Sequence, residues 1–325
     1  MTARHDVVVV GDVNPDLILT GDDPTPRFGQ AEIVVDGATF GIGGSAAITA
    51  TALARLGLRC ALVGTVGDDD LGRLLLDRLA AEGVDITGVE RRPGESTGIS
   101  VHLAGGGDRA IITHIGAMAA TSGRQVPDEL LASTGQVHLA GLFLLPGLRA
   151  SAADLLRRAG RLGCRRSVDP NWDPSGRWDL DDVLDQVDLV LVNQAEALGL
   201  SGRHRDDEAL GLGGRRRDDE ALAALRSRVA TVVVKGGGAG AVVATGDSVV
   251  CLPAPEVAVV DTVGAGDSFD AGFLAATVAG ASPTEALALG LAVGSLSVGG
   301  AGGTGARWTA GDARRLAAAV TPTRR

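Results

Sequence analysis

The sequence predicts an α/β fold in which a doubly wound parallel sheet forms the core and a small β-sheet forms a lid. Short apolar runs, the first at residues 7–10, alternate with Ala- and Leu-rich helical segments along most of the 325 residues. This alternation is typical of a parallel sheet covered by helices. Between residues 97 and 114, two β-like runs joined by glycines indicate a hairpin outside the core. No linker divides the chain, so we expect a single domain over residues 1–325, with lid segments at about 13–40 and 96–116.

In the N-terminal half, each predicted strand is a short run of apolar or β-branched residues bounded by Gly, Pro or Asp. The predicted helices are Ala- or Leu-rich segments that stop before Gly57 and Gly83, and a glycine commonly ends a helix. Strands are predicted at residues 7–10, 13–19, 33–36, 60–63, 97–103 and 110–114, and helices at 46–56 and 71–81.

In the C-terminal half the alternation of strands and helices resumes. A charged segment beginning at Gly202 recurs at Gly214, and its charge predicts a solvated helix and loop lengthened by a local duplication over residues 202–222. Strands are predicted at residues 137–140, 166–169, 189–192, 232–234 and 242–244, and helices at 150–162, 275–279, 285–291 and 313–320.

The composition and charge of the chain limit the kinds of molecule that it can bind. Hydrophobic residues make up 45% of the chain, and the formal net charge of −10 argues against nucleic acid as a partner. No apolar run reaches the length of a membrane span, and the first residues lack the apolar stretch of a signal peptide. The widely spaced cysteines lie in apolar stretches, which fits reduced thiols. We therefore expect a cytoplasmic protein that acts on a small molecule.

The most informative stretch is Asp-Thr-Val-Gly-Ala-Gly-Asp-Ser-Phe at residues 261–269. A helix is expected to start at Gly264, Ala265 and Gly266, where free N–H groups and the helix dipole make an anion site. Asp267 lies in that first turn, so its carboxylate could take a proton from a hydroxyl while a phosphate gathers charge. The alternative is that Asp261 or Asp267 only caps the helix.

This stretch closely resembles the second signature of the ribokinase/PfkB family of carbohydrate kinases. In that family the last Asp of the motif is the catalytic base, and the Gly-Ala-Gly amides form the anion hole. The resemblance therefore implies a ribokinase-like fold, ATP and Mg²⁺ as cofactors, and a sugar-like substrate. It assigns catalytic roles to Asp267, Gly264, Ala265 and Gly266.

Segments near the N-terminus resemble further parts of the same family pattern. Asn14 and Asp16 match the place where the family binds sugar hydroxyls, and both side chains suit a vicinal diol. Residues 43–57 resemble the first family signature, whose glycines let the backbone approach the sugar. The substrate-binding residues implied by the resemblance are Asn14, Asp16, Gly43, Gly44, Ser45 and Ile48.

Two of these positions depart from the family pattern. Ile48 stands where the family usually has Asn, and Ser45 stands where ribose-specific members have Lys. Both departures remove polar contacts to a sugar, so the pocket should prefer a less hydroxylated face, and simple ribose is not the expected substrate.

Asn193 and Glu196 resemble the family's Asn-x-x-Glu motif, which acts near the magnesium and the phosphates, largely through water. Their spacing equally suits a helix capping box, and both interpretations can hold together. The resemblance also implies nucleotide contacts at Lys235, Gly237, Gly240 and Thr262, and a site for a monovalent cation such as K⁺ near the backbone of Asp261 and Val263.

Several alternatives remain open from the sequence. A nucleoside kinase of the same family would need a stacking aromatic, for which Phe28 or Phe40 could serve. A non-catalytic sugar sensor could use the same fold. Gly41–Ala46 formally matches a dinucleotide fingerprint, although it does not directly follow the first strand. His102 and His114 lie in the predicted lid and either meet the substrate or occupy half-exposed strand positions. An exposed lid sheet would also make a homodimer reasonable.

Overall fold

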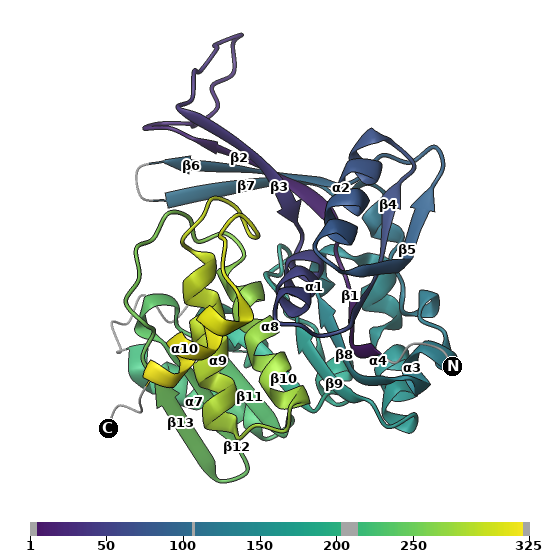
Figure 1. Cartoon of the computed structure of the whole chain (residues 1–325), viewed down its shortest axis with the longest axis vertical. Coiled ribbons are helices and arrows are strands. Elements are labelled where there is room, and N and C mark those ends of the chain that lie inside the picture. Colours follow the sequence, from purple (N-terminus) through teal and green to yellow (C-terminus); the bar gives the residue numbers. More distant parts are fainter. Residues whose placement is uncertain (1–4, 106–107, 203–213, 321–325) are drawn as a thin grey trace.

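The computed structural model describes residues 5–105, 108–202 and 214–320. In these segments a large sheet has the strand order β13-β12-β11-β10-β9-β8-β1-β4-β5, and it is parallel except at β12 and β13 (Figure 1). Its strands are β1 (His5–Val10), β4 (Cys60–Gly67), β5 (Asp85–Arg92), β8 (Thr134–Ala140), β9 (Arg165–Asp169), β10 (Leu189–Asn193), β11 (Thr231–Lys235), β12 (Ala241–Thr245) and β13 (Ser248–Leu252).

Helices cover both faces of this sheet. Alternate side chains of β1 point to opposite faces, so that Val7 and Val9 belong to one apolar core while Val8 and Val10 belong to the other. The first core includes residues of α1, α2, α8 and α9, and the second includes residues of α3 to α7. The helices are α1 (Ser45–Arg55), α2 (Asp70–Ala81), α3 (Asp128–Ala132), α4 (Pro146–Arg161), α5 (Asp181–Leu184), α6 (Gln194–Leu200), α7 (Gly214–Arg226), α8 (Ala265–Val278), α9 (Pro283–Ser297) and α10 (Ala310–Ala319).

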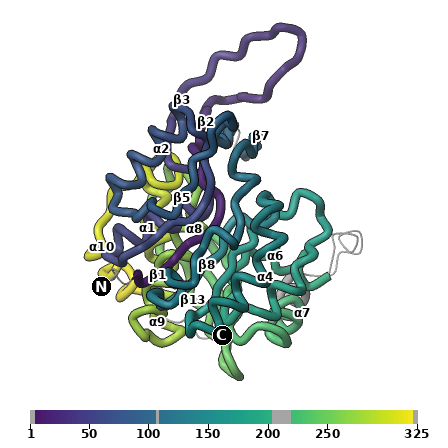
Figure 2. The backbone as a smooth tube through the Cα atoms, turned by 90° about the vertical axis from the view of Figure 1, so that its right-hand side faces the viewer, coloured from purple at the N-terminus to yellow at the C-terminus, as the bar shows by residue number. Residues whose placement is uncertain are grey.

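A second, smaller sheet lies beyond one edge of the core, at the top of Figure 1. Its strand order is β3-β2-β6-β7, formed by β2 (Asn14–Thr20), β3 (Gly37–Gly43), β6 (Ile99–Gly105) and β7 (Asp108–His114). Residues 21–36 extend from β2 and β3 as a long loop (Figure 2). Phe28 on that loop is fully exposed. The predicted α/β class, with a doubly wound core and a small second sheet, is confirmed.

The strand predicted at residues 33–36 is wrong, because the chain is irregular there and the strand is β3. The apolar residues of 33–36 find no partner strand, whereas the glycine-rich segment after them pairs with β2, with Gly41 opposite Asp16. Glycine is required two residues later, since a Cβ on Gly43 would lie 2.0 Å from the Asp16 carboxylate.

The remaining differences concern sheet edges and short helices. β5 and β13 were not predicted, and both are edge strands of the large sheet. α3 and α5 were also not predicted. α6 follows the capping box that the spacing of Asn193 and Glu196 suggested, and α8 begins at Ala265, as expected from the turn at Gly264, and continues through the helical run predicted at residues 275–279. The first copy of the predicted duplication falls on residues 203–213, outside the described residues, and the second copy begins α7. None of the helices in the described segments is long and apolar enough to span a membrane.

Candidate active site

The predicted site residues gather where the parallel strands of the large sheet end. Asp169 is the last residue of β9, Asn193 of β10 and Lys235 of β11, and the register pairs Asn193 with Lys235. The chain that leaves β1 continues through Asp12 into β2, which starts at Asn14. Ligands of open α/β sheets bind at this carboxyl edge, so the topology brings these distant segments to one place.

The start of α8 forms the predicted anion site. Gly264 has a left-handed backbone (φ 71°), and a Cβ there would lie 2.6 Å from the Gly303 Cα. The first bond of the helix runs from the Ser268 N–H to the Gly264 carbonyl (2.9 Å). The N–H groups of Gly266 and Asp267 precede that bond and point out of the helix end. The Ala265 N–H instead donates to the Thr262 carbonyl (3.3 Å), so this amide is already engaged within the loop.

Asp267 lies half-buried in this first turn. Burial, reinforced by the charge of Asp169, raises the pKa of Asp267 to about 7, although Lys235 and the Ser45 hydroxyl favour the ionised form. The Thr49 hydroxyl of α1 donates to the Asp267 carbonyl oxygen (3.2 Å), which joins the two helices at the site. A carboxylate with a pKa near neutrality can accept a proton at physiological pH and is well matched to general-base work.

Lys235, the only lysine of the sequence, is held by two buried carboxylates. Its Nζ lies 2.6 Å from Asp169 and 3.0 Å from Asp270, with side-chain exposures of 11%, 3% and 1% respectively. Burial opposes the charge of Lys235, but the two carboxylates raise its pKa above the usual range. A Cβ on Gly266 would lie 3.5 Å from this ammonium, so the charge sits beside the anion site. The Lys235 side chain thus belongs to an ion-pair cluster next to the anion site.

Asn193 and Glu196 form the capping box of α6. The Asn193 side chain accepts the Glu196 N–H (2.9 Å), and the Glu196 carboxylate accepts the Asn193 N–H (2.8 Å). Burial, followed by the charge of Asp169, raises the pKa of Glu196 to about 8. Within the described segments no three His, Cys, Asp or Glu side chains are grouped as a metal site. This arrangement fits Mg²⁺ only where phosphates and water supply most of its ligands.

Asn14 and Asp16 belong to a polar network on the small sheet. The Asn14 amide donates to Asp16 Oδ1 and to the Ser100 hydroxyl, both at 3.2 Å. The His102 ring lies next to Asp16, with Nε2 3.3 Å from Oδ2, and both of its buried nitrogens lack a hydrogen bond in the described part of the chain. His114 instead contacts Ser96 (2.9 Å) at an exposed position. Of the two histidines, only His102 lies next to a residue that was predicted to bind the substrate, namely Asp16.

Asp12 was not predicted as a site residue, yet it fixes the start of α1. Its carboxylate accepts the N–H groups of Ser45 (3.0 Å) and Ala46 (2.9 Å). A Cβ on Gly44 (φ 82°) would lie 2.7 Å from the Asp12 carbonyl oxygen, so glycine is required there. Burial raises the pKa of Asp12. An acid directly after the first buried strand was the signal that could have identified it.

The buried Ile48 side chain packs beside the anion site. Its Cδ1 would lie 2.4 Å from a Cβ on Gly303 and 3.1 Å from one on Gly264. An apolar side chain thus fills the position where the family pattern has a polar one.

The backbone conformation explains why glycine stands at the two positions that were predicted to contact the nucleotide. Gly237 and Gly240 both have positive φ, and a Cβ on Gly240 would lie 2.0 Å from the Leu252 carbonyl oxygen.

The Thr262 hydroxyl accepts a hydrogen bond from Arg109 of β7 (3.1 Å), which joins the small sheet to the loop before α8. Asp261 accepts the N–H groups of Val263 (3.0 Å) and Gly302 (2.8 Å), so its carboxylate ties two loops together.

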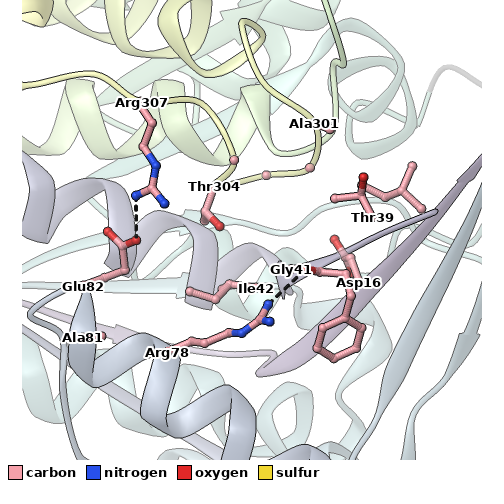
Figure 3. Close-up of a pocket in the computed structure, with 15 residues that line it drawn as sticks. Asp16, Thr39, Gly41, Ile42, Arg78, Ala81, Glu82, Ala301, Thr304 and Arg307 are labelled. Carbon is pink, nitrogen blue, oxygen red and sulfur yellow. Dashed lines mark hydrogen bonds and ion pairs between the residues drawn. The ribbon is translucent and has the colours of Figure 1, made fainter. Parts of the chain in front are cut away.

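A cavity of about 390 Å³ opens between β2, β3, α2 and residues 301–307 (Figure 3). Asp16 lines it, as do Phe40, Arg78 and Arg307. Phe28, the other suggested stacking residue, belongs to the exposed loop at residues 21–36 and does not line the cavity. The dinucleotide fingerprint at Gly41–Ala46 does not form the required turn, because Gly41 and Gly43 lie within β3.

The sequence and the structure were compared with those of known proteins. The sequence model described as pfkB family carbohydrate kinase matches residues 4–310. An ATP-dependent ribose-1-phosphate kinase from Halopiger xanaduensis is 31% identical over 294 residues, or 90% of this chain and 92% of the relative. The structure of adenosine kinase from Sinorhizobium meliloti has a TM-score of 0.82 at 27% identity, and the match covers 97% of this chain and 100% of that one. A protein assigned as ribokinase II from E. coli, solved with ATP and Mg²⁺, has a TM-score of 0.80 at 26% identity, with coverage of 96% and 98%.

Proposed function

Because the chain belongs to the pfkB family of carbohydrate kinases and has its ribokinase-like fold, we propose that it transfers the γ-phosphate of ATP to a primary hydroxyl of a sugar or sugar derivative, with Asp267 as the base. The observation that carries this proposal is the position of Asp267. Its carboxyl group, with a pKa of about 7, lies in the first turn of α8, directly beside the free N–H of Gly266.

The proposed step uses groups that the site already orients. The Asp267 carboxylate takes the proton of the substrate hydroxyl, whose oxygen then bonds to the γ-phosphorus as the bond to ADP breaks. The N–H groups of Gly266 and Asp267 stabilise the negative charge that gathers on the transferred phosphate, and one such donor is worth about 3 kcal/mol. Asn14 and Asp16 bind substrate hydroxyls, and the backbone at Gly43 and Gly44 approaches the sugar.

Mg²⁺ would neutralise phosphate charge, with Glu196 reaching it through water. Because Asp169 and burial already oppose the ionised form of Glu196, a nearby cation would favour its deprotonation. We also propose a monovalent cation such as K⁺ at the backbone of Asp261 and Val263. The Asp261 carboxylate supports it by holding this loop against Gly302.

A nucleoside kinase is the second candidate. Phe40 lines the cavity beside Asp16, and its ring could pack against a base. The likeness to adenosine kinase over 97% of this chain favours the same alternative.

The test is ADP release with Mg·ATP across a panel of sugars, sugar phosphates, sugar acids and nucleosides. We expect a clear rate with one sugar-like class and none when its primary hydroxyl is blocked. A clear rate with nucleosides alone would establish the second candidate instead. ATP binding without turnover on any compound would contradict both kinase assignments and favour a sugar sensor.

The pH dependence of kcat/KM should report the raised pKa of Asp267. The carboxylate must be ionised to accept a proton, so activity is full above its pKa and is lost as the pH falls through about 7. We expect a decline of about tenfold per pH unit below that point. Initial rates between about pH 5 and pH 9 would show it. A profile that stays flat down to about pH 5 would mean that the base has an ordinary aspartate pKa.

A further inference from the structure

We propose that the substrate carries an anionic group, a phosphate or a carboxylate, remote from its reactive hydroxyl, and that Arg78 and Arg307 bind this group. The inference rests on the proposed function, because it assigns the substrate class of the same site. It comes from the charge distribution in the cavity of Figure 3.

The cavity that holds the two arginines adjoins the reacting end of the site. Gly303 lines it and also packs against Gly264 at the anion site. Asp16 lines one side, while Arg307 and Glu82 lie across the cavity from it (Figure 3). A volume of about 390 Å³ is within the usual range for a small-molecule site. A sugar whose hydroxyl meets Asp267 would therefore extend its far end towards the arginines.

Arg78 on α2 forms no ion pair with a carboxylate within the described residues. Its guanidinium lies over the Phe40 ring, 5.1 Å from the centroid, and Nη1 donates to the Phe40 carbonyl oxygen (2.9 Å). These two contacts hold the planar group in place at the wall of the cavity. A guanidinium fixed in this way loses little freedom when it binds an anion.

Arg307 adds a second charge that is only loosely compensated. Its Nη1 lies 3.8 Å from Glu82, and its side chain is 86% exposed. The Glu82 carboxylate is already engaged by Arg55, which donates to both of its oxygens at 2.7 and 2.8 Å. This pair lowers the pKa of Glu82 and neutralises Arg55 rather than Arg307.

Because Arg55 engages Glu82, Arg78 and Arg307 face only the carboxylate of Asp16 among the described residues of the cavity, which leaves a local excess of positive charge in a chain whose net charge is −10. A neutral sugar needs paired donors and acceptors, as Asn14 and Asp16 provide, and gains little from two guanidinium groups that no carboxylate of the described residues engages closely. Phosphate and carboxylate both accept the parallel N–H donors of arginine, often from two arginines at once. The apolar Ile48, which packs against Gly303 of the cavity wall, agrees with a substrate recognised by its charge as well as by its hydroxyls.

The experiment compares a neutral pentose, its 1-phosphate, its 5-phosphate and a sugar acid in ADP release with wild type, Arg78→Gln, Arg307→Gln and the double variant. The 5-phosphate has its primary hydroxyl blocked and controls for the site of transfer. Arg73→Gln is the matched control, because Arg73 is an exposed residue of the same helix that pairs with Asp70 and does not line the cavity. We expect KM for the anionic substrate to rise about tenfold in each single variant and about a hundredfold in the double variant. The effect on kcat should be smaller, and Arg73→Gln should match wild type.

Calorimetric titration of the pentose 1-phosphate and the sugar acid without ATP gives a readout independent of turnover. Anion binding that is lost in the double variant supports the inference even if no compound releases ADP, and in that case the proposed function fails alone. Turnover of a neutral sugar with equal KM in wild type and the double variant leaves the kinase intact and overturns the inference. Whichever of the phosphate and the acid binds more tightly identifies the anionic group. Absence of both binding and turnover contradicts both proposals.

Discussion

Replacement of Asp267 by Asn is expected to lower kcat by roughly two or more orders of magnitude while ATP binding is retained. Asn has the same shape as Asp but cannot take a proton from the substrate hydroxyl. The N–H groups of Gly266 and residue 267 belong to the backbone and are kept, so the anion site should persist. Initial rates with Mg·ATP and the best substrate give kcat, and calorimetry with ATP gives the affinity.

A matched control for this prediction is Asp247→Asn. Asp247 is exposed in the turn between β12 and β13, so the same loss of charge there should leave both kcat and ATP affinity unchanged. Turnover of Asp267→Asn close to that of wild type would remove Asp267 from the role of base. Loss of ATP binding in the same variant would instead indicate that the carboxylate helps to build the nucleotide site.

The central strands were predictable because burial on both faces makes them continuous apolar runs. Val7 to Val10 is such a run, and each of its side chains is fully buried. Edge strands lack this signal. β5 has only Ile86 and Val89 as apolar residues among charged and polar ones, and β3 is rich in glycine. Their strand structure depends on pairing with a neighbour that lies far away in the sequence, which local propensity does not encode.

The site shows the same division between local and distant information. The turn at Gly264 and the position of Asp267 follow from residues that are adjacent in the sequence. The ion pair of Lys235 with Asp169 joins strand ends that are 66 residues apart, so only the sheet order brings it together. Asp270 could have been suspected, since it is one acid in an otherwise apolar stretch of α8 and lies one turn after Asp267. Arg78 and Arg307 are far apart in the sequence and are brought together only by lining the same cavity, so no sequence motif indicated them.

Lys235→Met is expected to destabilise the protein by about 3–5 kcal/mol, because it removes one partner of a buried ion pair and leaves the others uncompensated. Asp169 and Asp270 are almost completely buried, so water cannot replace the ammonium. Met fills a similar volume, which keeps the expected loss electrostatic and not a cavity effect. The midpoint and slope of urea unfolding at neutral pH would measure the change in free energy.

Because the expected loss of stability in Lys235→Met is electrostatic, it should depend on pH. In the variant the orphaned carboxyls have folded-state pKa values above their unfolded ones, so the charged forms destabilise at high pH and protonation relieves the penalty as the pH falls. The deficit relative to wild type should therefore shrink between about pH 8 and pH 5. Lys235→Met combined with Asp270→Asn should recover part of the loss, and Arg314→Met on the exposed surface of α10 should cost little. A deficit below about 1 kcal/mol, or one that is independent of pH, would show that the cluster does not depend on the lysine charge.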